Sequence, residues 1–365
     1  MAAKPQVTIF VDDKALEPKY LRLLRGLEVQ QAVHTQAQFH LRFSIGQDAT
    51  GDWAAFAEKT FKPSQSIKIE AKVTDRTVRL INGILTQLKM NFKADPCESE
   101  MELSGFDALE KLKRSQPTGK FKGRDIPTVV NYVFDAADIA PADTAKIPNL
   151  GASDPQRKVL MQAHDDLEFL RMLATTVNCE VYVEPTASAD QGHFEPLDLD
   201  AAQELTATIN VNQGDRTNVR NAQFYYDLSQ ETVVEADFVD ANGKHTTSVT
   251  KSLGDQLSER DKTVLGPPGF QSVKRLERHG REDRKELERL CEAELDKLAW
   301  VVIGKGELDS AAYGDVLVPR HRVVVNGAAT AFNGRYLVWS VKHTFTRELY
   351  CQSFELRRKL GVQTS

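Results

Sequence analysis

Apolar and polar residues alternate along several stretches of the N-terminal third. Residues 7–11, 39–45 and 67–73 each carry an apolar side chain at every second position. A period of two places these side chains on one face of a β-strand. Segments such as Asn82-Gly83 lie between the runs and are typical of turns. The pattern predicts a small barrel or sandwich built from short strands.

The apolar period becomes helical from about residue 106. Asp125 is a candidate N-cap, and apolar residues follow it at helical spacing. Asp165 and Glu168 form a D-x-x-E capping pattern in front of a second apolar stripe. A strand-like run at residues 180–183 comes next. The pattern therefore predicts an α+β region in the middle of the chain.

Strand-like alternation returns near residue 206. The runs 233–239 and 245–249 flank Asn242-Gly243 and predict a hairpin with a type I′ turn. Residues 266–269, with the sequence Gly-Pro-Pro-Gly, predict a loop.

The last quarter of the chain begins with a charged stretch. Residues 281–299 have an apolar stripe that predicts a helix, with Arg284 and Glu288 as an i,i+4 pair. Gly304-Lys305-Gly306 lacks the spacing of a phosphate-binding loop, and we expect a turn there. The remaining residues alternate again and predict strands.

A set of short motifs occurs in a characteristic order. Residues 7–13, 81–85 and 165–174 precede a C-terminal group that contains Gly314-Asp315-Val316, residues 333–343 and Ser353-Phe354-Glu355-Leu356. This ordered set resembles the late-control D family of phage tail proteins. That family includes the tail hubs of contractile phages and the hub half of VgrG proteins. No single motif is specific, but the resemblance spans nearly the whole chain.

The resemblance implies a mainly β fold with α+β insertions, in which two related β-barrels form a trimeric, pseudo-sixfold hub. The expected divisions are 1–105 for the first barrel, 106–200 for an α+β middle domain, 201–250 and 300–365 for the second barrel, and 251–299 for a loop and charged-helix insertion. The final motif lies near Ser365, so the spike is expected to be a separate protein.

The resemblance also implies a structural and non-enzymatic role. Such a hub adapts a sixfold tail tube to a threefold spike. Its expected partners are further copies of itself, the spike protein, the first ring of the inner tube protein and other baseplate proteins. The barrel strands are expected to form the assembly interface, through Phe39, Leu41, Phe43, Ile81, Ile84, Tyr336, Val338, Trp339, His343 and Phe354.

Composition narrows the alternatives. The net charge of -5 and the pI of about 6.0 argue against a nucleic-acid carrier. The 8 histidines and 4 cysteines lack metal-site spacing, so no metal or cofactor is expected, and His343 is interpreted as a packing or hydrogen-bonding residue. No secretory leader or membrane-length apolar run is evident, which predicts assembly in the cytoplasm and then a place in a baseplate.

One alternative comes from the acidic cluster Asp165, Asp166 and Glu168, which could act as the acid pair of a cell-wall glycan hydrolase or belong to a glycan-binding module. Helix capping accounts for two of these residues without any chemistry. The sequence leaves open whether the particle is a phage tail, a tailocin or another contractile injection system.

Overall fold

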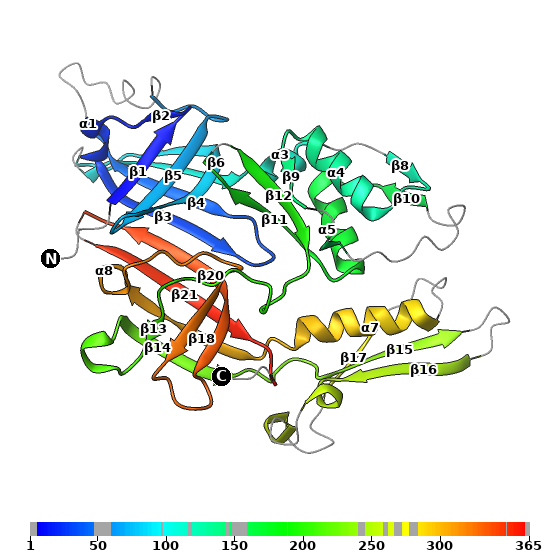
Figure 1. The fold of residues 1–365 in the computed structure, drawn as a ribbon. Helices are drawn as coiled ribbons and strands as arrows, with labels where there is room; N and C mark the ends of the chain where they lie inside the picture. The colour runs from blue at the N-terminus through cyan, green and yellow to red at the C-terminus, as the bar shows by residue number, and fades with distance from the viewer. Residues whose placement is uncertain are drawn as a thin grey trace.

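The computed structural model describes residues 6–46, 60–95, 98–115, 119–143, 146–147, 159–187, 189–239, 245–257, 262–265, 272–276, 284–347 and 349–361. The fold is mainly β (Figure 1), and the described strands form one 13-stranded sheet and three small sheets. None of these sheets closes on itself within the described residues. The expected mainly β fold is confirmed, and in the described residues the two expected barrels are two parts of one continuous open sheet.

The large sheet contains two six-stranded units. Unit 1 consists of β1 (Gln6–Val11), β3 (Leu24–Ala32), β4 (Gln38–Ser44), β5 (Ser66–Val73), β6 (Arg76–Asn91) and β7 (Glu100–Asp107). Unit 2 consists of β13 (Ile209–Asn210), β14 (Val219–Tyr226), β18 (Val302–Asp309), β19 (Arg322–Asn326), β20 (Gly334–Phe345) and β21 (Tyr350–Arg358). The short β2 (Lys14–Ala15) extends unit 1 beside β1.

The two units have the same topology. Unit 1 has the spatial order β3-β4-β7-β6-β5-β1, and unit 2 has the order β14-β18-β21-β20-β19-β13. When the strands of each unit are numbered along the chain, both orders become 2-3-6-5-4-1. The one difference in direction is the last pair, because β1 and β5 are antiparallel whereas β13 and β19 are parallel.

The irregularities of the units also coincide. The second strand carries an extra residue against the third in both units, Arg25 in β3 and Arg220 in β14. The fifth strand carries an extra residue against the sixth, Thr86 in β6 and Trp339 in β20. A β-bulge fixes register and bends a sheet, so matching bulges indicate that the units are two versions of one structure.

Each unit has its own apolar core, because alternating residues of its strands point inward. Leu41, Ile69 and Leu103 lie in the core of unit 1, and Val323 and Leu356 in that of unit 2. β7 continues two residues past the expected boundary at 105. The expected domain boundaries stay predictions.

The middle region forms a separate layer beside unit 1 (Figure 1). Helices α3 (Leu109–Lys113), α4 (Ile126–Ala136) and α5 (Asp166–Thr176) share a core with the sheet of β11 (Glu180–Pro185), β12 (Asp190–Glu195) and β9 (Ala140–Pro141). β8 (Gly119–Lys122) pairs with β10 (Val159–Gln162).

Both expected caps are confirmed, since Thr128 N donates to Asp125 at 3.1 Å and Glu168 N donates to Asp165 at 2.9 Å.

The insertion between β14 and β18 forms a small α/β layer. α7 (Arg284–Leu298) packs on β15 (Val233–Val239) and β16 (His245–Ser252), with β17 (Val273–Arg275) beside β15. The expected hairpin and the Arg284–Glu288 pair, at 3.1 Å, are confirmed. Asn242-Gly243 and residues 266–269 lie outside the described residues. Short helices in the described residues include α1 (Pro18–Leu21), α8 (Ser310–Tyr313), η3 (Gly214–Arg216), η4 (Leu253–Gln256) and η5 (Thr263–Leu265).

Two expected turns lie inside strands instead. Asn82-Gly83 belongs to β6, and Gly304-Lys305-Gly306 belongs to β18. Aromatic rings occupy the space that a side chain would fill. A Cβ on Gly83 would lie 2.5 Å from the ring of Phe39, and one on Gly304 would lie 2.5 Å from the ring of Phe224. These glycines allow close packing rather than a change of chain direction.

Candidate assembly site

The two units meet at one strand pair. β3 of unit 1 pairs antiparallel with the second half of β20, from Ser340 opposite Ala32 to Phe345 opposite Leu27. The first half of β20 pairs with β19 on the same side. We call the β3–β20 pair the internal joint. It makes the sheets of unit 1 and unit 2 continuous (Figure 1).

His343 lies at the centre of the internal joint, opposite Val29. It is fully buried, and its Nδ1 is 2.8 Å from the hydroxyl of Tyr350. Burial lowers the pKa of His343 to about 3, so the ring is neutral at physiological pH. The interpretation of His343 as a packing and hydrogen-bonding residue is confirmed.

A buried ion pair holds the middle region against the internal joint. Arg320, just before β19, donates from Nε to Glu180 of β11 at 3.0 Å and from Nη2 to the carbonyl of Ala32 at 3.1 Å. The backbone N–H of His34 donates to the same carboxylate at 2.6 Å. Glu180 is therefore bonded to groups of both units.

The electrostatics of this pair favour the charged forms. Burial lowers the pKa of Arg320, but the charge and hydrogen bonds of Glu180 outweigh burial and raise that pKa above its ordinary value. The guanidinium also lies 4.0 Å from the centre of the Tyr182 ring. Removal of one partner from a buried charge pair of this kind strongly destabilises the folded protein, because the other charge stays buried without compensation.

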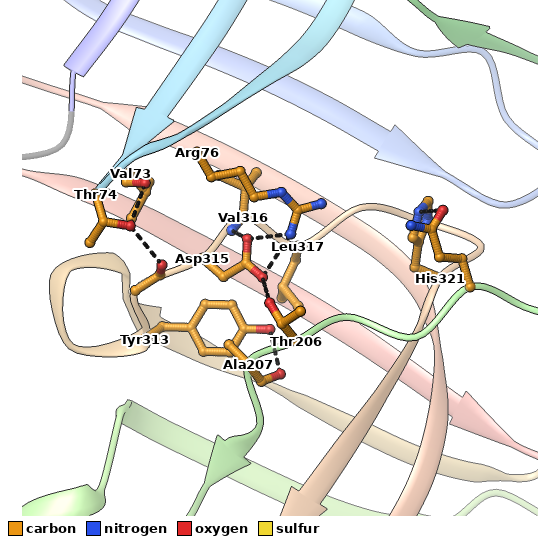
Figure 2. A network of polar contacts seen from close by, with 12 residues as sticks. Val73, Thr74, Arg76, Thr206, Ala207, Tyr313, Asp315, Val316, Leu317 and His321 are labelled. Carbon is orange, nitrogen blue, oxygen red and sulfur yellow. Dashed lines mark hydrogen bonds and ion pairs between the residues drawn. The ribbon is translucent and has the colours of Figure 1, made fainter.

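Asp315 anchors a second contact between the units (Figure 2). Arg76, the first residue of β6, donates from Nη1 to both carboxylate oxygens at 2.7 and 2.8 Å. Thr206 donates to the same carboxylate at 3.0 Å, and so does the backbone N–H of Val316 at 2.7 Å. Thr74 donates to the carbonyl of Gly314 at 3.4 Å.

Gln352 of β21 fixes the backbone behind Asp315. Its amide donates to the carbonyl of Asp315 at 2.9 Å and to Ser310 at 3.2 Å, and its carbonyl accepts from Leu317 N at 2.7 Å. Because Asp315 and Gln352 are buried, these bonds hold the segment from Tyr313 to Leu317 in one conformation.

Most of the expected interface residues are core residues of the single chain. Ile84 and Trp339 are the two with partial exposure. Ile84 lines a cleft of about 570 Å³ beside the middle region, and Trp339 packs against Arg357 at 4.3 Å. The side chains that face inward, and therefore have no surface to offer a partner, are Phe39, Leu41, Phe43, Ile81, Tyr336, Val338, His343 and Phe354. The resemblance indicated which strands to expect at an interface, and the residues expected on them lie on the inner face.

Strand edges offer a surface that side-chain pattern does not reveal. β14 pairs with β18 on one side, and its other side has no strand partner among the described residues. β6 pairs with β5 up to Ile84, and Leu85 still bonds to Ser64 and Gln65. Beyond Leu85, the described strands pair with β6 on its β7 side alone. We call these two surfaces the β14 edge and the β6 edge.

A cleft of about 540 Å³ lies between the middle region and unit 2. His193 there lies 3.3 Å from Glu184 and 3.4 Å from Glu195, and Tyr182 and Lys146 each donate to Glu195 at 2.6 Å. Burial lowers the pKa of His193, but the two carboxylates raise it overall. Burial raises the pKa of Glu195, but its three partners lower it overall to about 2. The pKa of Glu184 is also lowered by His193. With lowered pKa values, Glu184 and Glu195 are both ionised at neutral pH. Neither of them supplies the protonated carboxyl that glycoside hydrolysis requires.

The acidic cluster at α5 has structural partners. Asp165 caps the helix, Asp166 is buried and accepts from Gln162 at 2.6 Å, and Glu168 lies 3.6 Å from His164. Among the described residues, no group of three or more acidic, histidine or cysteine side chains has the arrangement of a metal site. Within the same part of the chain, no helix is long and apolar enough to cross a membrane.

Sequence reasoning missed Arg76, Glu180 and Arg320. Each is a charged residue at the start of a strand or just before one, where a surface position is the ordinary expectation. Asp315 was noted within a family motif, but its partner is 239 positions away in the chain. Such pairs become visible when the strand order is known.

The fold is that of phage tail and type VI secretion proteins. The chain superposes on the 43 kDa tail protein of prophage MuSo2 from Shewanella oneidensis with a TM-score of 0.70, at 11% identity over 97% of this chain and 98% of that one. A tail protein from Neisseria meningitidis MC58 gives a TM-score of 0.70, at 13% identity over 98% and 97%.

A component of the E. coli type VI secretion system gives a TM-score of 0.55, at 16% identity over 97% of this chain and 76% of that one. That component is described as similar in structure to the T4 bacteriophage tail proteins gp27 and gp5. No protein-family model and no curated protein sequence matches the chain significantly. The structural likeness confirms the fold that the sequence resemblance implied.

Proposed function

We propose that this chain is the structural hub of a phage tail or a phage tail-like particle. Three copies form a ring of six units around the particle axis. One face of the ring meets the first ring of the sixfold tube protein, and the other meets a threefold spike protein. Other baseplate proteins contact the outer layers, and the hub assembles in the cytoplasm before it becomes part of the particle.

The duplicated unit carries this proposal. Two units with the order 2-3-6-5-4-1 and matching bulges lie in one chain, joined through the internal joint. Three copies of a chain with two near-equivalent units form a ring of six units. Such a ring can contact a sixfold partner although its own symmetry is threefold. A closed ring also satisfies contacts that would otherwise remain open. The fold likeness to tail proteins supports the same conclusion.

The proposed role is geometric, and no catalytic step is assigned to the chain. The buried Arg320–Glu180 and Arg76–Asp315 pairs fix how the units and the middle region are held together. Buried contacts with several bonds keep these parts in one arrangement, which suits a geometric role.

The mass of the purified chain, alone and mixed with its tube and spike proteins, tests this proposal. We expect three copies per complex and, in electron micrographs of whole particles, density for the chain on the central axis between tube and spike. A copy number other than three, or a position away from the axis, would overturn it.

A further inference from the structure

The internal joint joins the second strand of one unit to the fifth strand of the other. β3 is strand 2 of unit 1, and β20 is strand 5 of unit 2. Their counterparts are β14, strand 2 of unit 2, and β6, strand 5 of unit 1. The β14 edge and the β6 edge are therefore the same two surfaces that meet inside the chain, in copies that lack a partner among the described residues.

We propose that the β14 edge of one copy pairs antiparallel with the β6 edge of a second copy of this chain. This inference rests on the three-copy ring proposed above and names the surfaces that close it. Each copy then contributes one internal joint and one equivalent joint to its neighbour. Because the two edges differ from each other, the contact is heterologous and closes into a ring rather than a pair.

The bulges define which residues correspond. Arg25 of β3 corresponds to Arg220 of β14, and Trp339 of β20 corresponds to Thr86 of β6. Counting from these positions transfers the register of the internal joint to the joint between copies. The expected opposite pairs are Leu88 with Tyr226, Lys89 with Tyr225, Met90 with Phe224, Asn91 with Gln223 and Phe92 with Ala222.

Burial at corresponding positions supports the pairing. Phe345, at the end of the internal joint, is 4% exposed, whereas its counterpart Phe92 is 59% exposed. Val341 is fully buried, whereas its counterpart Leu88 is partly exposed. On the β6 edge, Leu88 and Phe92 are therefore more exposed than their counterparts, which β3 covers. An open strand edge with exposed apolar residues is a surface that natural proteins cover.

The β14 edge shows the same contrast. Val29 of β3 is fully buried at the internal joint, whereas its counterpart Phe224 is partly exposed. Tyr225 and Tyr226 follow it and are also partly exposed. Three consecutive aromatic residues on an edge strand provide large cross-strand contacts at low loss of side-chain entropy.

Disulfide trapping with the double variant Lys89→Cys/Tyr225→Cys tests the pairing. Opposite residues on paired strands have Cα atoms close enough for a disulfide. Oxidation of the assembled hub is expected to give a ladder on a non-reducing gel that ends at three linked copies. The double variant Gln30→Cys/Lys342→Cys is the positive control, because these residues are opposite each other at the internal joint and should link within one chain.

One further double variant tests the register, and the single variants test the background. Lys89→Cys/Gln223→Cys moves one thiol by two positions, beyond the usual disulfide range, and should not give the ladder. Each single variant controls for the native cysteines. Linking through Gln223→Cys rather than Tyr225→Cys would overturn the proposed register.

The outcomes separate this inference from the proposed function. A three-copy ring that fails to link through Lys89→Cys/Tyr225→Cys, while the positive control links, would overturn the strand pairing and leave the hub intact. A chain that forms no ring with its tube and spike proteins would overturn both. A variant without cysteine substitutions, Phe92→Lys, tests the same contact. It is expected to leave the melting temperature of the single chain unchanged within a few degrees and to abolish the ring.

Discussion

Units 1 and 2 share strand order and bulges, but they differ at their edges. In unit 1, strand 2 is covered by β20, and the end of strand 5 has no partner on that side among the described strands. In unit 2, the end of strand 5 is covered by β3, and strand 2 has one described partner, β18. The difference is reciprocal, as it must be when two copies of one unit are joined once. In the proposed ring, the pair of surfaces joined inside each chain recurs as the contact between chains.

The insertions of the two units also differ. The chain between β14 and β18 of unit 2 contains the α7 layer, whereas β3 and β4 of unit 1 follow each other closely. The middle region follows unit 1 and is held by Arg320 of unit 2. The β-sheet units thus form the shared part of the molecule, and the added layers distinguish one unit from the other.

The largest expected effect is on the attachment of the middle region. Arg320→Ala leaves Glu180 buried without its charged partner, and we expect a loss of about 3–5 kcal/mol in the free energy of unfolding. Lys342→Ala is the control at the same joint. Lys342 is 2.9 Å from Glu28, but both side chains are partly exposed, so the expected loss is below about 1 kcal/mol. Equal losses in urea denaturation would contradict the assigned role of Arg320.

Glycine substitutions test whether close backbone packing stabilises both units. A Cβ on Gly105 would lie 2.0 Å from the carbonyl oxygen of Ile84, and one on Gly306 would lie 2.4 Å from that of Asn221. Backbone must move in both cases, so each Gly→Ala change should cost about 2–3 kcal/mol. Gly46→Ala, which meets no atom within 4 Å, should change stability little. A tolerated Gly306→Ala would show that unit 2 does not depend on this packing.

The internal joint contains a buried titratable side chain, His343, whose counterpart on the β6 edge, Met90, does not titrate. The pKa of His343 falls from 6.5 to about 3 on folding. The stability it contributes is complete above pH 6.5 and decreases as pH falls toward 3, since the unfolded chain then binds a proton that the folded chain does not. The expected loss between pH 8 and pH 5 is about 2 kcal/mol.

The variant His343→Gln isolates this effect, because glutamine does not titrate. Urea unfolding of both proteins at pH 8 and pH 5 gives four free energies. The wild type should lose about 2 kcal/mol more than the variant on acidification. Parallel losses in both proteins would assign the pH dependence to other groups.

Local pattern was sufficient to predict many elements of this fold. Residues 39–45 and 67–73 are strands, and Asp125 and Asp165 cap helices, because these features depend on neighbours within a few positions. The same reasoning failed at Gly83 and Gly304, where rings from other strands fill the space above the glycine. A sequence window cannot show a ring that arrives from a distant strand.

The candidate site was harder to predict than the fold. The family resemblance pointed to the barrel strands as the interface, but the residues it suggested, such as Phe39 and Tyr336, lie on the inward face of those strands. The edges that we propose for assembly are defined by which strands lie beside one another. That information depends on pairs such as β3 with β20, more than 300 positions apart in the chain.

The smallest expected effect concerns Phe92 in the unassembled chain. Its side chain is 59% exposed, so Phe92→Ala should change the free energy of unfolding of the single chain by less than about 1 kcal/mol. Phe345→Ala is the matched control at the corresponding position, where the ring is 4% exposed and stacks on Tyr350 at 3.9 Å; we expect a loss of about 3 kcal/mol or more. Urea denaturation below the concentration of assembly measures both. If Phe92→Ala were as destabilising as Phe345→Ala, Phe92 would be part of the single chain's own core, and the contrast between a covered and an open joint would be lost.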